Sequence, residues 1–315
     1  MSDELRPALS LSHVVKRYGA VTAVDGVTFD VRPGEMFGLI GPDGAGKTTT
    51  IRLLCGLLHA DGGAVRVMGH DPVAEHAEIT QSVGYLSQRF SLYGDLSFDE
   101  NIAFFAEIHG LWKYDARRTR LLELTQLLPF RARLAERLSG GMKQKLALAC
   151  TLIHEPRVIL LDEPTTGVDP VSRREFWKLL AEFLQQGITI LVSTPYLDEA
   201  ERCHRVALLH EGKLLSLDTP DRLRAQLPGQ MVELIVAEQA RAVPIITEMP
   251  HVLDVHVFGE RVHARVQAGV AGDPVALVTG DLAARGFAVH GARAVEASLE
   301  DVFIARLEEA ATQGR

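Results

Sequence analysis

Hydrophobic positions change their spacing several times along the chain, and each spacing predicts a type of element. In residues 9–31 apolar and polar positions alternate in short bursts broken at Tyr18-Gly19 and Asp25-Gly26, which predicts antiparallel strands joined by turns. The uninterrupted apolar run Met36–Ile40 predicts a strand that is buried on both faces. A glycine-rich stretch follows it and leads into a helix predicted over residues 48–58.

Helical spacing dominates residues 89–153. One predicted face carries Ile102, Phe105, Ala106 and His109, and another carries Met142, Leu146, Ala149 and Ile153. Strand patterns return at 158–161 and 188–192, and the helix between them begins at Asp169-Pro170, a capping carboxylate followed by proline. Because strands alternate with helices, the sequence predicts a largely parallel α/β sheet that is interrupted by a helical insertion.

The dipeptide Pro228-Gly229 marks a predicted domain boundary. Strand and helix patterns beyond it cover residues 231–237, 240–249, 252–258, 261–267, 275–285 and 288–294, and a last helix begins at Ser298. The order strand, helix, strand, strand, helix, strand is that of a ferredoxin-like split βαβ unit. The chain is therefore expected to comprise a large α/β domain, residues 1–227, and a small α+β domain, residues 228–315.

Composition narrows the function classes. The chain has 315 residues, of which 47% are hydrophobic and 23% charged, an ordinary globular balance. A net charge of −8 argues against a dedicated nucleic-acid surface. The three cysteines form no CxxC pair and the twelve histidines show no HExxH spacing, so we expect neither a disulfide framework nor a structural transition metal. No apolar run reaches about 18 residues and no secretory signal is present, so another chain is expected to provide any membrane span.

Residues 41–48, Gly-Pro-Asp-Gly-Ala-Gly-Lys-Thr, match the phosphate-binding pattern G-x-x-x-x-G-K-[ST] between a predicted strand and a predicted helix. Glycines let backbone N–H groups turn toward phosphates, and the helix N-terminus adds partial positive charge. Lys47 is expected to reach the β- and γ-phosphates of ATP, and Thr48 to help hold Mg²⁺. The expected ATP contacts are Gly41, Pro42, Asp43, Gly44, Ala45, Gly46, Lys47, Thr48 and Thr49.

Two carboxylates follow the apolar run at 158–161. In an open α/β sheet the carboxyl end of a buried strand faces the ligand crevice. Asp162 is therefore expected to hold Mg²⁺, and Glu163 to orient the attacking water or accept its proton. Considered alone, the pair could also be two solvated surface acids. Together with the phosphate loop it predicts hydrolysis of Mg-ATP.

Residues 138–144, Leu-Ser-Gly-Gly-Met-Lys-Gln, resemble the signature motif of ABC transporter ATPases, and the resemblance extends over roughly residues 9–223. It implies a P-loop NTPase fold with a RecA-like core sheet, an antiparallel β subdomain and a helical insertion. In this family the signature serves the ATP on the facing subunit, which implies a head-to-tail dimer. Ser139, Gly140 and Gly141 are then ATP contacts, whereas alone Ser139 would be a helix N-cap.

Three further positions resemble functional residues of the family. Tyr18 resembles the aromatic residue that stacks on adenine, and Gln88 resembles the glutamine that contacts Mg²⁺ and joins the sheet to the helical insertion. The resemblance thus adds Gln88 to Lys47 and Glu163 as catalytic residues. Asp169 resembles an aspartate that communicates across the dimer. Without the resemblance, Tyr18 and Gln88 would be ordinary surface residues and Asp169 an N-cap.

Two residues depart from the family pattern. Pro195 follows Ser-Thr where the family usually has histidine, and proline cannot donate a hydrogen bond to the γ-phosphate. Loss of one transition-state donor costs on the order of 10²–10³ in rate, so we hypothesise slow hydrolysis at this site. The chain would then pair with a different ATPase subunit, as in the first half of tandem exporter ATPases, or form a homodimer that tolerates Pro195. Asp43 replaces a commoner asparagine; its extra charge should weaken nucleotide binding unless the side chain points outward or contacts a partner, and both outcomes stay open.

Residues 297–304 resemble the tail of drug-export ATPases that work with ABC-2-type permeases, and this tail is expected to serve dimerisation, regulation or stability alone. Apolar residues after Gln88 are expected either to receive a permease helix or to form core; they are Phe90, Leu92, Tyr93, Leu96 and Phe98. We thus expect a cytoplasmic exporter motor held at the inner face of the membrane. Two alternative functions are less favoured. A soluble ABC ATPase acting on ribosomes or DNA typically has a coiled coil or a basic segment, and this sequence has no heptad array and no basic block. A regulator that binds ATP without hydrolysis would not need the carboxylate of Glu163.

Overall fold

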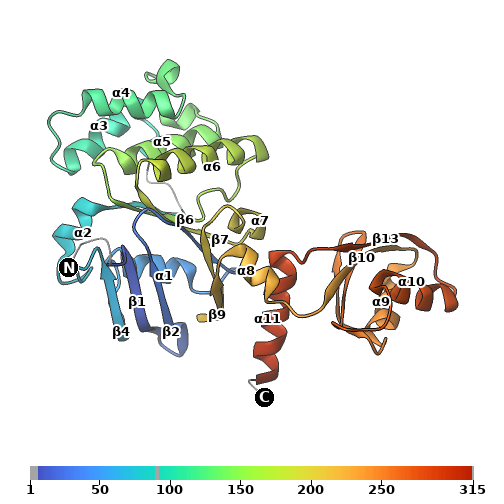
Figure 1. Cartoon of the computed structure of the whole chain (residues 1–315). Helices are drawn as coiled ribbons and strands as arrows, with labels where there is room; N and C mark the ends of the chain where they lie inside the picture. The colour runs from blue at the N-terminus through green and yellow to red at the C-terminus, as the bar shows by residue number, and fades with distance from the viewer. Residues whose placement is uncertain (1–5, 89–91, 314–315) are drawn as a thin grey trace. The chain divides into compact units, whose positions relative to one another are not determined.

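The computed structural model describes residues 6–88 and 92–313, and its contacts divide the chain into two compact units, residues 1–219 and 220–315 (Figure 1). The break precedes helix α8 (Pro220–Ala225), whereas the sequence pattern favours a boundary at Pro228-Gly229. Within the described ranges, no helix is both long and apolar enough to cross a bilayer.

The first unit begins with a three-stranded antiparallel sheet in the order β2-β1-β4. Its strands are β1 (Leu9–Tyr18), β2 (Val21–Val31) and β4 (Gly62–Val67). The chain turns after Tyr18 as predicted, but the turn predicted at Asp25-Gly26 is wrong, because both residues lie inside β2. The register shifts there and Gly26 has φ of 67°, so the dipeptide forms a bulge that keeps the strand paired.

A six-stranded sheet in the order β5-β6-β7-β3-β8-β9 forms the centre of the first unit. The strands are β3 (Met36–Ile40), β5 (Val83–Leu86), β6 (Val158–Asp162), β7 (Thr189–Thr194), β8 (Arg205–His210) and β9 (Lys213–Asp218). All neighbours are parallel except the edge strand β9, so the predicted α/β sheet is confirmed. Every residue of β3, β6 and β7 is buried, as expected for strands covered on both faces.

Helices connect the strands of this sheet. They are α1 (Lys47–Leu54), α2 (His76–Ser82), α3 (Phe98–Ile108), α4 (Asp115–Leu124), α5 (Gly140–Leu152), α6 (Pro170–Gln185) and α7 (Leu197–Ala200), with 3₁₀ turns at Leu128–Phe130 and Ala135–Arg137. Those between β5 and β6, which are α3, α4 and α5, form the predicted insertion. The prediction that α1 reaches Leu58 is wrong. Gly56, with φ of 69°, packs so closely that a Cβ would lie 2.0 Å from the Pro72 carbonyl oxygen, and this tight turn ends the helix.

Asn101 on α3 organises the loop that precedes this helix. Its fully buried amide accepts a hydrogen bond from the Tyr93 N–H (3.0 Å) and donates to the carbonyls of Tyr93, Leu96 and Ser97 (3.0–3.1 Å). Among the residues expected to dock a permease or form core, Phe98 belongs to the core. Tyr93 is 45% exposed, Leu92 and Leu96 are half-buried, and Phe90 lies outside the described residues.

The second unit contains a four-stranded antiparallel sheet in the order β11-β12-β10-β13, the order expected of a ferredoxin-like split βαβ unit. Its elements after α8 are β10 (Gln230–Val236), α9 (Gln239–Thr247), β11 (Val252–Phe258), β12 (Arg261–Val266), α10 (Pro274–Ala284), β13 (Val289–Val295) and α11 (Leu299–Gln313). One sheet face, including Val232, Leu234 and Ala264, forms an apolar core with Ile246 of α9 and Leu282 of α10.

Replacing Asn101 with alanine should destabilise the first unit by about 1–3 kcal/mol, because buried backbone groups lose their partners. Urea unfolding followed by tryptophan fluorescence measures this unit selectively, since Trp112 and Trp177 are the only two tryptophans of the chain. Glu107→Gln on the exposed side of the same helix is the control and should stay within about 0.5 kcal/mol of the parent. An unchanged unfolding midpoint for Asn101→Ala would show that the amide does not hold the loop.

Candidate nucleotide-binding site

The phosphate loop connects β3 to α1 and depends on its glycines. Gly46 has φ of 98°, and a Cβ there would lie 2.3 Å from the Ala23 carbonyl oxygen. At Gly41 a Cβ would lie 2.3 Å from the Leu209 carbonyl oxygen. Larger residues at either position would therefore force the loop away from its neighbours. The glycines thus fix a tight turn that delivers Lys47 at the N-terminus of α1.

Lys47 lies inside this loop with only 3% of its surface exposed. Its ammonium donates to the carbonyl oxygens of Gly41 (2.8 Å) and Pro42 (3.0 Å). It also forms an ion pair with the carboxylate of Glu163 at 3.0 Å. The loop cation and the residue after β6 are thus joined directly.

Asp162 is the last residue of β6 and lies beside Thr48 of α1. Its Oδ1 accepts hydrogen bonds from the hydroxyls of Ser193 on β7 (2.8 Å) and Thr48 on α1 (3.1 Å). Its Oδ2 is buried and has no hydrogen-bond partner in the described part of the chain. Burial is the main cause that raises the pKa of Asp162. Adjacent carboxylate and hydroxyl oxygens fit Mg²⁺, which prefers oxygen ligands and would also neutralise the unpaired oxygen.

Glu163 directly follows β6 in a strained conformation, with φ of 49°. Its backbone N–H donates to the hydroxyl of Ser193 (3.0 Å), while its carboxylate accepts from the Gln88 amide (3.0 Å) and pairs with Lys47. The structure therefore brings together all three residues that were predicted to be catalytic. Strain that is held by several contacts is common where a side chain must be aimed at a ligand.

A pocket of about 610 Å³ opens beside the phosphate loop. Of the predicted residues, Tyr18, Asp43, Gly44, Ala45, Gly46, Lys47, Thr48, Thr49, Gln88 and Glu163 line it. The sequence analysis missed Val21, Thr22 and Ala23 of β2, and Glu211 just after β8. No local motif marks these four residues, because the sheets bring them to the loop from distant parts of the chain.

Comparison with known proteins identifies relatives of this chain. A family model described as ABC transporter matches residues 24–166. The probable multidrug ABC transporter ATP-binding protein YbhF of Escherichia coli is 42% identical over 220 residues, which are 69% of this chain and 38% of that relative. The daunorubicin resistance ATP-binding protein DrrA2 of Streptomyces coeruleorubidus is 35% identical over 294 residues, 92% of this chain and 91% of the relative. The chain belongs to the ABC transporter family of ATP-binding proteins.

Solved structures of ABC ATPases carry the same fold. The ATP binding subunit of an ABC transporter matches with a TM-score of 0.64 and 32% identity over 70% of this chain and 92% of the other. A dimeric bacterial ABC transporter cassette matches with a TM-score of 0.61 and 26% identity over 67% and 98%. The predicted fold class and the family resemblance are therefore confirmed. This chain spans 38% of the length of YbhF, so it corresponds to one part of that longer protein.

The ABC signature residues lie outside the pocket of their own chain. Ser139 is exposed and caps α5 by accepting a hydrogen bond from the Met142 N–H at 3.3 Å. A Cβ at Gly141 would lie 2.3 Å from the Ser172 hydroxyl, so packing of α5 against α6 requires this glycine. A Cβ at Gly140 would meet nothing within 4 Å among the described residues, so no packing contact seen in that part of the chain explains this glycine.

Glu199, which the sequence analysis missed, joins the loop after β6 to the end of β7. This buried carboxylate accepts hydrogen bonds from Thr165 and Thr194, both at 2.6 Å. Pro195 follows Thr194 at the carboxyl end of β7, next to the start of the phosphate loop, where the Gly41 N–H donates to the Thr194 carbonyl at 3.4 Å. Asp169 caps α6, as one interpretation expected, and the N–H of Ser172 lowers its pKa.

Alanine substitutions at Gly140 and Gly141 should affect stability differently, because only Gly141 is tightly packed. Gly141→Ala should destabilise the first unit by about 1–3 kcal/mol, since the methyl group overpacks the contact with Ser172. Gly140→Ala should leave stability unchanged or raise it by up to about 1 kcal/mol, because alanine favours helix. Urea unfolding followed by tryptophan fluorescence tests both variants. Equal destabilisation would contradict the different packing of these positions.

Proposed function

We propose that this ABC protein binds and hydrolyses Mg-ATP and drives an exporter whose membrane channel is a separate permease. The convergence of Lys47, Glu163 and Gln88 beside the phosphate loop carries this proposal. A surface ion pair would not require a buried lysine, a strained glutamate and a glycine-built turn at one point. These features support catalysis on a phosphate better than they support a purely structural role.

Each group at the site has a chemical role in this proposal. Lys47 and the N-terminus of α1 bind the phosphates, and the ring of Tyr18 stacks on adenine. Thr48, Asp162 and Gln88 hold Mg²⁺, which when bound neutralises charge on the phosphates. Glu163 orients the attacking water or accepts its proton, and Gln88 and Lys47 keep its carboxylate in position. Asp43 and Glu211 place two more carboxylates around the pocket and should weaken nucleotide affinity.

The working unit is proposed to be a head-to-tail dimer. Ser139 and Gly140 are exposed at the N-terminus of α5, and no described residue lies within 4 Å of a Cβ placed at Gly140. A γ-phosphate on a facing subunit would use the open space at Gly140 and the backbone N–H groups there. The likeness to a dimeric cassette supports this arrangement.

Export is proposed from the relatives, whose names describe multidrug and daunorubicin resistance ATP-binding proteins. The permease is proposed to be of the ABC-2 type, and the chain to work in the cytoplasm at the inner face of the membrane. Tyr93 lies on the loop that Asn101 fixes, and its exposed ring suits contact with a permease helix. No nucleic-acid partner is proposed, in keeping with the net charge of −8.

Glu163→Gln should reduce ATP turnover by about 10²–10⁴-fold, because the amide cannot accept a proton from water. ATP binding should persist, since the phosphate loop and Lys47 are unchanged. Phosphate release measures turnover and equilibrium dialysis with ATP measures binding. Glu107→Gln serves as the control for an exposed glutamate. Undiminished turnover in Glu163→Gln would remove this residue from the catalytic step.

Pro195→His should raise turnover by up to about 10²–10³-fold, because the imidazole restores a donor toward the γ-phosphate. The measurement is phosphate release by the purified chain over a range of protein concentrations. Turnover per subunit that rises with concentration would indicate a homodimer that tolerates Pro195. Bound ATP with no turnover in either protein would indicate a required second ATPase chain. Equal, efficient turnover in both proteins would contradict the slow-site hypothesis.

A further inference from the structure

The two faces of the sheet in the second unit differ in chemistry. Residues of one face form the apolar core with α9 and α10. The opposite face carries charged and histidine side chains, among them Glu233, Asp254 and His263, and the first two of these are buried. Burial of so many polar groups requires partners for each of them. One cluster on this face has an atom without such a partner.

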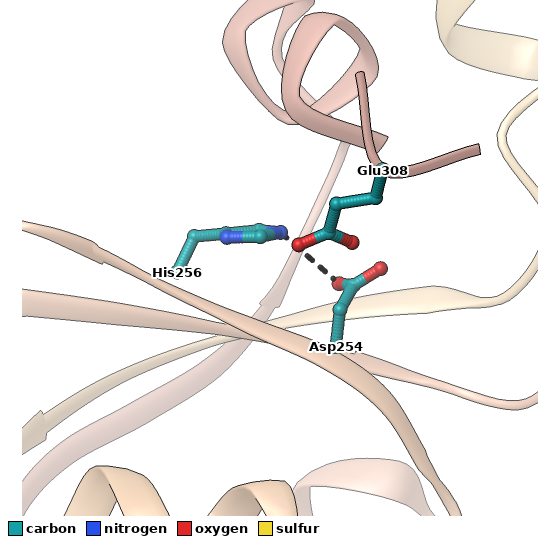
Figure 2. A group of neighbouring side chains, drawn as sticks. All are labelled: Asp254, His256 and Glu308. Atoms are coloured by element: carbon teal, nitrogen blue, oxygen red, sulfur yellow. Dashed lines mark ion pairs between the residues drawn. The ribbon is translucent and has the colours of Figure 1, made fainter. Parts of the chain in front are cut away.

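That cluster consists of Asp254 and His256 of β11 and Glu308 of α11. Positions two apart on a strand point to the same face, so the first two side chains are neighbours. One ligand atom of each residue lies within 4.8 Å of the ligand atoms of the other two. Figure 2 shows the three side chains pointing toward one another from the strand and the helix.

Asp254 is held in place by Arg265, its partner on β12. The guanidinium donates two hydrogen bonds to Oδ2, one of them 2.7 Å from Nε, which leaves Oδ1 facing His256 Nε2 at 3.5 Å. With one arginine and two carboxylates, the group has a formal charge of −1 when His256 is neutral. The arginine thus orients a ligand while leaving net attraction for a cation, as outer groups around metal sites do.

His256 Nε2 is buried and makes no hydrogen bond within residues 6–88 and 92–313; its contact with Asp254 Oδ1 is an ion pair at 3.5 Å (Figure 2). An unsatisfied buried nitrogen costs free energy that a hydrogen bond or a metal would remove. The atom faces two carboxylate groups, and imidazole nitrogen with carboxylate oxygen is a common donor set for Zn²⁺. The observation therefore indicates a ligand at this point more directly than an acidic cluster would.

We propose that Asp254, His256 and Glu308 bind a divalent cation of the Zn²⁺ class, with water completing its coordination. Ligand bonds of about 2.0–2.2 Å at tetrahedral angles place donor atoms about 3.3–3.6 Å apart, and the 3.5 Å between His256 Nε2 and Asp254 Oδ1 fits. Glu308 is exposed, so its side chain can rotate to close the remaining distance. The ion would attach α11 to β11.

Calorimetric titration of Zn²⁺ into the untagged, nucleotide-free full chain after chelator treatment tests the proposal. We expect one equivalent of Zn²⁺ to bind and to raise the melting temperature. His256→Ala should abolish this binding, and Glu308→Gln should weaken it at least about tenfold. The matched controls are His290→Ala, an exposed histidine on β13, and Glu309→Gln, next to Glu308 on α11; both should bind like the parent.

Substitution of exposed Glu308 does not disturb the core, so this variant keeps the test valid if His256→Ala fails to fold. Absence of Zn²⁺ binding by the parent chain would overturn the proposal and leave the contact between His256 and Asp254 as a pair without metal. Binding that neither substitution weakens would also overturn it, by locating the ion elsewhere. Thr48 and Asp162 are intact in every variant, so either failure leaves the proposed ATPase function untouched.

Discussion

The buried ion pair between Lys47 and Glu163 is the interaction on which the nucleotide site depends. Two charges with 3% and 7% exposure lose most of their hydration, and such a pair is favourable only if other groups satisfy it. Here the Gly41 and Pro42 carbonyls accept from the lysine and Gln88 donates to the glutamate. The glycine turn, the sheet edge and the loop after β5 must therefore all be correctly placed for the pair to be stable.

The order of strands explains how one edge of the sheet supplies the whole site. Strand β7 lies between β6, which ends in Asp162, and β3, which leads into the phosphate loop. Ser193 of β7 bonds Asp162 while the next residue, Thr194, pairs with Ile40 at the end of β3. Because this ladder fixes β7, the residue that follows it must emerge beside the phosphate loop. Pro195 occupies that position, and the hypothesis of slow hydrolysis rests on its lack of a donor there.

Sequence reasoning succeeded where the determinants are local and failed where distant segments meet. The phosphate loop, Asp162 and Glu163 are contiguous motifs at strand ends, and alternation was sufficient to outline the sheet of the second unit. Glu199 and Glu211 carry no such pattern, because their neighbours are set by the parallel sheet. The Asp25-Gly26 dipeptide consists of residues that are common in turns, yet β2 stays paired with β1 on both sides of it, and the dipeptide forms a bulge. At this dipeptide, strand pairing in the folded structure therefore overrides the local preference for a turn.

Polar contacts attach α11 to the sheet of the second unit, whereas apolar packing forms the core of that unit. Asp301 of α11 bonds Ser298 and the ring of His263 on β12, at 2.7 and 2.9 Å. Asp301 raises the pKa of His263, while hydrogen bonds from His263 and Ser298 lower the pKa of Asp301 despite its burial. The His263 contribution is lost as pH rises through its raised pKa, and the Asp301 contribution as pH falls through its lowered pKa. The contact is therefore strongest between those values, and an ion at Glu308 would hold the later part of the helix independently.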